Sequence, residues 1–307
     1  MSATQDPAAI GREQLLLPSP PRRSGRLSDF GRSVLALARR DKLFAIGLAL
    51  VTIAVFLAVF GPAIAPQSTT DPDASALSAP PSSAHWFGTD SSGLDVFSRT
   101  LAAPRYDVTI ALVASIFSLL VGTVIGLLVT FFEGHAATVV MRVADVIQAF
   151  PLFVLAMVVV VTSGRSLVSL VGVIAFLNIP IYIRLMRSQV LALKHRGFVD
   201  AARASGVRER AVAFRHVYPN ALGPSIVQAS ITMGWAIILT AGISFVGAGI
   251  RPPTPEWGSM IATGAAEIVQ GDWWSALFPG VAMSLTVFGF AVVGEGLRNL
   301  LTQGGRS

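Results

Sequence analysis

The stretch VTIALVASIFSLLVGTVIGLLVTFF, Val108–Phe132, runs for 25 residues without a charged side chain. A helix rises about 1.5 Å per residue, so about 20 apolar residues cross the hydrocarbon core of a bilayer, which is about 30 Å thick. Five other charge-free runs of at least 18 residues share this property: Leu43–Thr70, Val146–Gly164, Ser166–Ile183, His216–Ile250 and Trp273–Gly294. The pattern predicts a chain that crosses a membrane repeatedly.

The composition supports that prediction. Of the 307 residues, 53% are hydrophobic and only 13% are charged, and the mean hydropathy is +0.66. A soluble domain carries about 25% charged residues, so an ordinary globular protein is excluded. The apolar runs do not alternate with polar residues, and backbone groups in lipid must be satisfied within their own segment. We therefore expect an all-α polytopic membrane protein with six transmembrane helices, at about 43–65, 108–132, 146–164, 166–183, 222–246 and 273–294.

Lysine and arginine are distributed unequally between the two sides of this six-span arrangement. Of the 23 basic residues, 19 fall on one side, mostly in the tail 1–41 and in the connection 184–220. The positive-inside rule places both termini and this connection in the cytoplasm. The net charge of +6 is thus a topology signal, and no nucleic-acid partner is expected. The chain divides into a basic tail, 1–41, and a transmembrane domain, 42–303; the tail is either solvated or forms a basic helix over 27–40 on the membrane surface.

The sequence argues against catalysis by this chain. A phosphate-binding loop needs Gly-Lys followed by Ser or Thr, but Lys42 follows an aspartate and Lys194 follows a leucine. An intramembrane metallohydrolase would need a motif such as His-Glu-x-x-His, which Glu133-Gly-His135 does not match. The chain has no cysteine, which excludes thiolate metal sites and cysteine nucleophiles. An ion-driven secondary transporter would need acidic residues near mid-membrane, and the six expected spans contain none.

The long cytoplasmic connection contains VDAARASGVRERAVAFRHVYPN, Val199–Asn220. Asp200 is suited to the first turn of a helix, Ala201 and Ala202 give that helix a smooth surface, and Gly206 ends it. A solvated loop would explain such residues in an arbitrary protein. Their spacing, however, resembles the EAA loop of ABC importer permeases, although Asp200 stands where that family usually has glutamate. The resemblance implies a short helix that docks on an ATP-binding subunit, with Asp200, Ala201, Ala202 and Gly206 as coupling contacts and Arg203 as a charged neighbour.

Further segments are similar to the oligopeptide, dipeptide and nickel branch of that family. They are His85–Arg99 (HWFGTDSSGLDVFSR), Arg142–Asp145 before Phe150-Pro151, Ser244–Gly249 leading to Pro252–Met260, Phe278–Gly280 and Gly294–Arg298. The resemblance covers about 41–300. In that branch Gly93 is commonly followed by arginine, whereas this chain has Leu94.

The resemblance implies a permease subunit of an ATP-driven importer of peptides in the cytoplasmic membrane of a bacterium or archaeon. It implies a second homologous permease, two ATP-binding subunits that hold ATP and magnesium, and an extracytoplasmic solute-binding protein, with no cofactor on this chain. Nickel or another small solute is the alternative cargo. Gln228, Ser230 and Thr232, the main polar residues of the fifth span, either line the substrate path or bond to carbonyls one turn back.

Overall fold

The computed structural model describes residues 26–132 and 134–303. The chain divides into two compact units, Met1–Ala36 and Leu37–Ser307. Helix α2 (Arg26–Arg40) covers the stretch for which a basic helix was one of the two expectations, and its position on a membrane surface stays a prediction. The second unit carries the fold that positions the candidate site.

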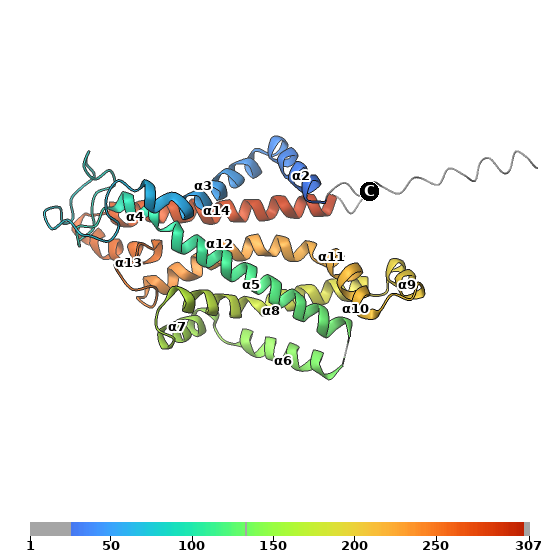
Figure 1. The fold of residues 1–307 in the computed structure, drawn as a ribbon. Coiled ribbons are helices and arrows are strands. Elements are labelled where there is room, and N and C mark those ends of the chain that lie inside the picture. Colours follow the sequence, from blue (N-terminus) through green and yellow to red (C-terminus); the bar gives the residue numbers. More distant parts are fainter. Residues whose placement is uncertain (1–25, 133, 304–307) are drawn as a thin grey trace, which may run out of the picture. The chain divides into compact units, whose positions relative to one another are not determined.

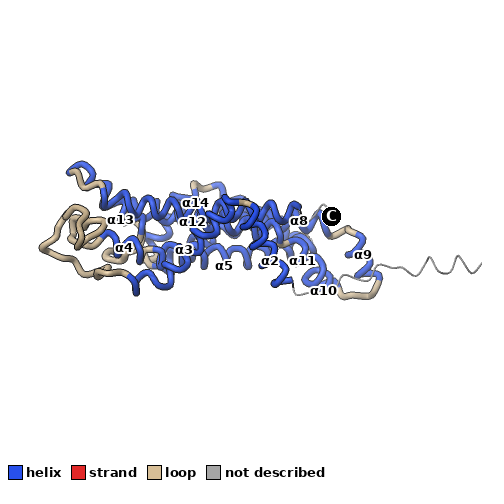
Figure 2. The backbone as a smooth tube through the Cα atoms, turned by 90° about the horizontal axis from the view of Figure 1, so that it is seen from above, coloured by secondary structure: helices blue, strands red, loops and turns tan. Residues whose placement is uncertain are grey.

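Five long helices lie side by side in the second unit (Figures 1 and 2). They are α3 (Lys42–Ile64), α5 (Pro104–Phe131), α8 (Leu167–Leu193), α12 (Gly223–Phe245) and α14 (Trp274–Gln303). Each contains a stretch long and apolar enough to cross a membrane. Among residues 26–132 and 134–303 the only β pairing is an isolated bridge between Thr89 and Asp95, so the all-α prediction is confirmed.

The segment expected as the third span, 146–164, is not one continuous helix. Helix α6 (His135–Ala149) and helix α7 (Leu152–Thr162) meet at an angle of 90°, and a sixth span is present only if this bent pair counts as one crossing. Pro151 accounts for the break, because a proline disfavours helical backbone in the residue before it, and Phe150 is extended with φ −80° and ψ 145°. The charge-free run 146–164 therefore does not correspond to one straight helix.

The bundle is held together most extensively by the contact between α5 and α8. Gly122 and Gly126 lie four residues apart on α5 and allow the two backbones to approach closely, as small residues do in membrane helix pairs. A Cβ atom added at Gly122 would lie 2.6 Å from the Cβ of Tyr182, and one at Gly126 would lie 2.7 Å from the carbonyl oxygen of Ile183. Neither position has room for a side chain.

Short helices close the two ends of the bundle (Figure 1). One end carries α4 (Val96–Ala102), α13 (Trp257–Glu267) and the 3₁₀ turn η2 (Ile268–Gln270). The other carries α9 (Gly197–Ala204), α10 (Glu209–Ala211), the π-helical turn η1 (Val212–Val217) and α11 (Tyr218–Ala221). Pro219 stands in the first turn of α11, where its missing N–H is not needed.

Candidate functional site

Helix α9, which carries the motif of the predicted coupling loop, rests with one side on the bundle. Val199 and Ala202 are buried. They belong to a hydrophobic cluster that also contains Leu127, Phe131, Met186, Val190, Val212, Ala213, Val217 and Ala221, from α5, α8, η1 and α11. Ala202, expected as a contact for a partner, therefore packs against this chain itself, because helical spacing places it on the same face as Val199.

Arg203 forms hydrogen bonds with the segments on both sides of α9. Its Nε donates to Glu209 Oε1 at 2.9 Å, and its Nη1 donates to the carbonyl oxygen of Lys194 at 3.2 Å. Nη1 also lies 3.4 Å from Asp200 Oδ1, and the guanidinium stands over the Phe131 ring at 5.7 Å from its centroid. The hydrogen bond that Arg203 donates to the Glu209 carboxylate raises the pKa of Arg203 above its ordinary value. The residue expected as a charged neighbour of the contacts thus ties the segments before and after α9 to one another.

The C-terminus of α9 is closed by a Schellman motif centred on Gly206. The Gly206 N–H donates to the Arg203 carbonyl at 2.9 Å, and the Val207 N–H donates to the Ala202 carbonyl at 3.2 Å. Gly206 has φ +76°, a left-handed conformation that costs other residues about 1–2 kcal/mol. A Cβ atom at this position would meet nothing within 4 Å, so backbone conformation rather than space requires glycine here.

This geometry predicts how Gly206 variants behave. Gly206→Val should loosen the end of α9, because a β-branched residue is strained at positive φ, whereas Gly206→Asn should be nearly neutral, since asparagine tolerates that region. A cost of one or two kcal/mol raises the open population of the turn about 5- to 30-fold. Limited trypsin cleavage after Arg208 should accelerate by that factor in Gly206→Val and little in Gly206→Asn. Equal rates in the two variants would contradict the assignment.

The opposite side of α9 is open to solvent. Asp200 and Ala201 are exposed there, together with Ala204 and Ser205. Phe198, one turn before Ala201, is 42% exposed and adds an aromatic ring to an otherwise small-residue surface. We call Phe198, Asp200, Ala201, Ala204 and Ser205 the α9 surface. Phe198 was not among the residues predicted, although its spacing of three from Ala201 would have placed it on this face.

The three candidate substrate-path residues occupy different environments on α12. Thr232 is buried and accepts a hydrogen bond from the Tyr182 hydroxyl at 3.1 Å. Ser230 is also buried, next to Gly294 of α14, whose added Cβ would lie 3.1 Å from the serine Cβ. Gln228 is half-buried, and its Nε2 lies 3.5 Å from Thr232 Oγ1. Two of the three therefore face neighbouring helices of the same bundle.

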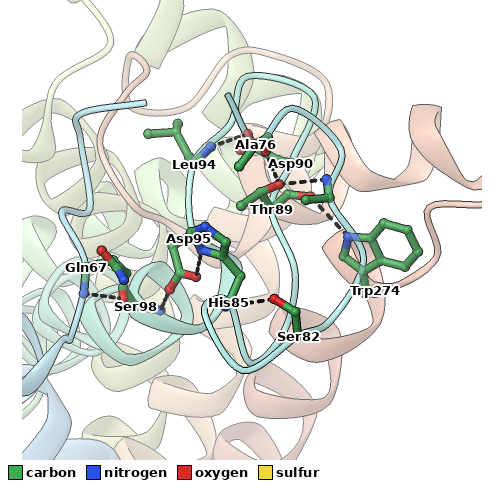
Figure 3. Close-up of polar contacts among 11 residues, drawn as sticks. Gln67, Ala76, Ser82, His85, Thr89, Asp90, Leu94, Asp95, Ser98 and Trp274 are labelled. Atoms are coloured by element: carbon green, nitrogen blue, oxygen red, sulfur yellow. Dashed lines mark hydrogen bonds and ion pairs between the residues drawn. The ribbon is translucent and has the colours of Figure 1, made fainter. Parts of the chain in front are cut away.

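The other end of the bundle carries a network of polar contacts, which we call the end cap, residues 67–99 and 250–275 (Figure 3). Asp95 accepts a hydrogen bond from the Ser98 N–H at 2.7 Å, which starts α4, and its second oxygen lies 2.8 Å from His85 Nδ1. Asp90 accepts from the N–H groups of Ser92 and Leu94, both at 2.9 Å. Burial raises the pKa of Asp90.

Arg99 joins the two segments of the end cap. Its Nη1 donates to the carbonyl oxygen of Thr69 at 2.8 Å and to that of Pro253 at 2.9 Å. The side chain is buried, so Arg99 does not form a surface pair with Asp95, which its spacing of four would have allowed. Leu94, which stands where the related branch has arginine, is buried in the end cap as an apolar side chain.

Two carboxyl groups are fully buried where the end cap meets the bundle. Glu256 accepts hydrogen bonds from the N–H groups of Gly258 and Ser259, both at 3.0 Å, and so starts α13. Asp107 of α5 accepts from the Trp257 N–H at 3.0 Å. Burial raises the pKa of Glu256. Asp107 corrects the expectation that the second span is free of acids: helix α5 begins at Pro104, four residues before the charge-free run.

The site has no metal-binding chemistry in the part of the chain that the structure describes, where no group of three or more His, Cys, Asp or Glu side chains could hold an ion. Its candidate groups are an exposed helical surface at one end of the bundle and a hydrogen-bonded polar cap at the other.

Comparison with protein families gives two matches. Residues 118–306 match the family described as binding-protein-dependent transport system inner membrane component. Residues 30–81 match the N-terminal transmembrane domain of oligopeptide transport permease C.

Known proteins resemble the chain over most of its length. A dipeptide transport system permease of Alkalihalophilus pseudofirmus is 36% identical over 263 residues, which cover 86% of each chain. A probable D,D-dipeptide transport system permease of Escherichia coli is 35% identical over 88% of this chain and 91% of its own length. A glutathione transport system permease of Pectobacterium atrosepticum is 41% identical over 73% of this chain and 74% of its own length.

Proposed function

The chain belongs to the binding-protein-dependent transport system inner membrane component family, and we propose that it is the permease subunit of an importer for small peptides. Membership makes it a multi-pass transport component of a bacterial inner membrane rather than an enzyme. Peptide cargo is supported by the relatives, which are named for dipeptides, D,D-dipeptides and glutathione, all short chains of amino acids.

The α9 surface is the proposed contact with an ATP-binding subunit. This chain contains no phosphate-binding loop. ATP would therefore be hydrolysed by a partner subunit, which must contact this chain to move it. Ala201, Ala204 and Ser205 allow close approach, and Phe198 and Asp200 supply an aromatic and a charged contact. The burial of Val199 and Ala202 leaves the opposite face of the helix for that partner.

We also propose a second permease, a second ATP-binding subunit and a solute-binding protein as partners. One bundle offers one such surface, so a second homologous permease would provide the surface for a second ATP-binding subunit. The end cap is the proposed contact for the extracytoplasmic solute-binding protein, because 19 of the 23 basic residues favour a cytoplasmic α9 and cytoplasmic termini. Among the path candidates, partial exposure favours Gln228, whose amide lies 3.5 Å from the buried Thr232 hydroxyl, whereas Ser230 is buried beside α14.

Reconstitution tests the proposal. The full complex, with the two permeases, two ATP-binding subunits and binding protein, is placed in liposomes and supplied with a labelled dipeptide, with glutathione or with nickel ions. Uptake of dipeptide that needs both ATP and the binding protein is the expected result. Nickel uptake without peptide uptake would overturn the cargo, and transport by the purified chain alone would overturn the coupled mechanism.

A further inference from the structure

A cavity between α6 and α8 is lined by two arginines that form no ion pair with the described residues of the chain. It has a volume of about 350 Å³ and is lined by Ala137, Thr138, Met141, Arg142, Asp145 and Arg187. We propose that it binds the headgroup of an anionic phospholipid. The inference depends on the membrane placement of the family and not on the cargo or on the ATP-binding partners.

The charge balance of the cavity is the first reason. Asp145 is already paired, since Arg184 Nη2 lies 2.6 Å from its Oδ1, and Arg184 also donates to Gln148. Arg142 of α6 and Arg187 of α8 have no hydrogen bond or ion pair with any residue in 26–132 or 134–303. Two arginines from different helices therefore face one cavity without a counter-ion, and a phosphate diester suits their guanidinium groups.

The position of the cavity is the second reason, and it favours a lipid over a soluble anion. Arg184 follows directly on the charge-free run Ser166–Ile183, so Arg187, one turn later, lies where α8 leaves the hydrocarbon core. Basic pockets between membrane helices at this depth are known to suit anionic headgroups.

The surface beside the cavity provides for the acyl chains. Val139, Val143 and Val146 lie along α6 next to the lining residues, and they are 61%, 53% and 59% exposed. Their spacing of four and three residues forms one continuous apolar stripe. An amphiphile with a negative headgroup and hydrocarbon chains would match both the cavity and this stripe.

Native mass spectrometry of the intact importer tests the proposal, with dioleoyl phosphatidylglycerol against dioleoyl phosphatidylcholine. We expect selective retention of phosphatidylglycerol. In Arg142→Gln/Arg187→Gln it should bind about 30-fold more weakly, since each interfacial arginine contributes about 1 kcal/mol. Arg142→Lys/Arg187→Lys should restore most of the binding. Arg251→Gln is the control for each single variant, Arg142→Gln and Arg187→Gln, because it removes one positive charge from an exposed position in the end cap.

Three outcomes would overturn the proposal: equal retention of both lipids, unchanged binding in the double glutamine variant, or competition by inorganic phosphate at the concentration of the lipid. If the double variant instead releases the second permease and leaves lipid binding unchanged, the cavity is a protein contact. Single variants, either arginine to glutamine, are used if the double variant does not fold. Lipid retention is measured without transport, so its failure is distinguishable from failure of the proposed function.

Discussion

Ala201→Arg is expected to abolish ATP-driven uptake while the subunit still folds and inserts. Ala201 is exposed at the middle of the α9 surface. An arginine there would hold an opposing surface away from the helix and add a second positive charge beside Arg203. Disruption at the centre of an interface costs at least about 2 kcal/mol, which weakens association about 30-fold.

Co-purification measures this effect directly. The ATP-binding subunits should be lost from the Ala201→Arg complex, while the second permease is retained. Ala136→Arg is the matched control, since Ala136 is an exposed alanine on α6, outside the α9 surface. If Ala201→Arg retains both the ATP-binding subunits and uptake, α9 is not the coupling contact.

Gly122→Leu is expected to prevent stable folding of the bundle. The new side chain would begin 2.6 Å from the Tyr182 Cβ and 2.8 Å from the carbonyl oxygen of Ile179. A backbone carbonyl cannot move aside without separating α5 from α8, so the cost exceeds the about 1–3 kcal/mol typical of a crowded core. Gly126→Leu should behave in the same way, because its Cβ would lie 2.7 Å from the Ile183 carbonyl oxygen.

The yield of monodisperse protein and its thermal unfolding in detergent measure this loss. Gly172→Leu on α8 is the control, since a Cβ at that position meets nothing within 4 Å. It introduces the same side chain into a membrane helix at an open position and should unfold like the unmodified protein. Equal stability of Gly122→Leu and Gly172→Leu would contradict the close approach of α5 and α8.

The apolar runs predict the membrane crossings well but not the ends of the helices. Helix α12, at Gly223–Phe245, lies within one residue of the predicted 222–246 at each end. Helix α8 continues to Leu193, ten residues beyond the predicted end at 183. Charge marks where a helix meets water, whereas hydrogen bonding continues as long as the backbone allows. The bend at Pro151 was not predicted, because the length of a charge-free run carries no information on the direction of the helix axis.

The candidate site is predictable only where it is local. The position of α9, its end at Gly206 and the exposure of Asp200 and Ala201 follow from residues within one short stretch. The pairing of Arg203 with Glu209 and its stacking over Phe131 depend on three segments meeting, and no spacing in the sequence encodes that. The same holds for Arg99, whose partners Thr69 and Pro253 lie in separate loops. The Gly122 and Gly126 pair has a recognisable spacing and could have been identified.

The packing of α9 against the bundle determines how a movement of this helix would be passed to the rest of the subunit. If α9 were joined to the bundle only by flexible loops, the loops would move with the helix and the bundle would not. Here Val199 packs among side chains of α5, α8 and η1. Arg203 donates hydrogen bonds to Lys194, before the helix, and to Glu209, after it. A displacement of α9 by the proposed ATP-binding partner would therefore be passed to η1 and, through α11, to α12.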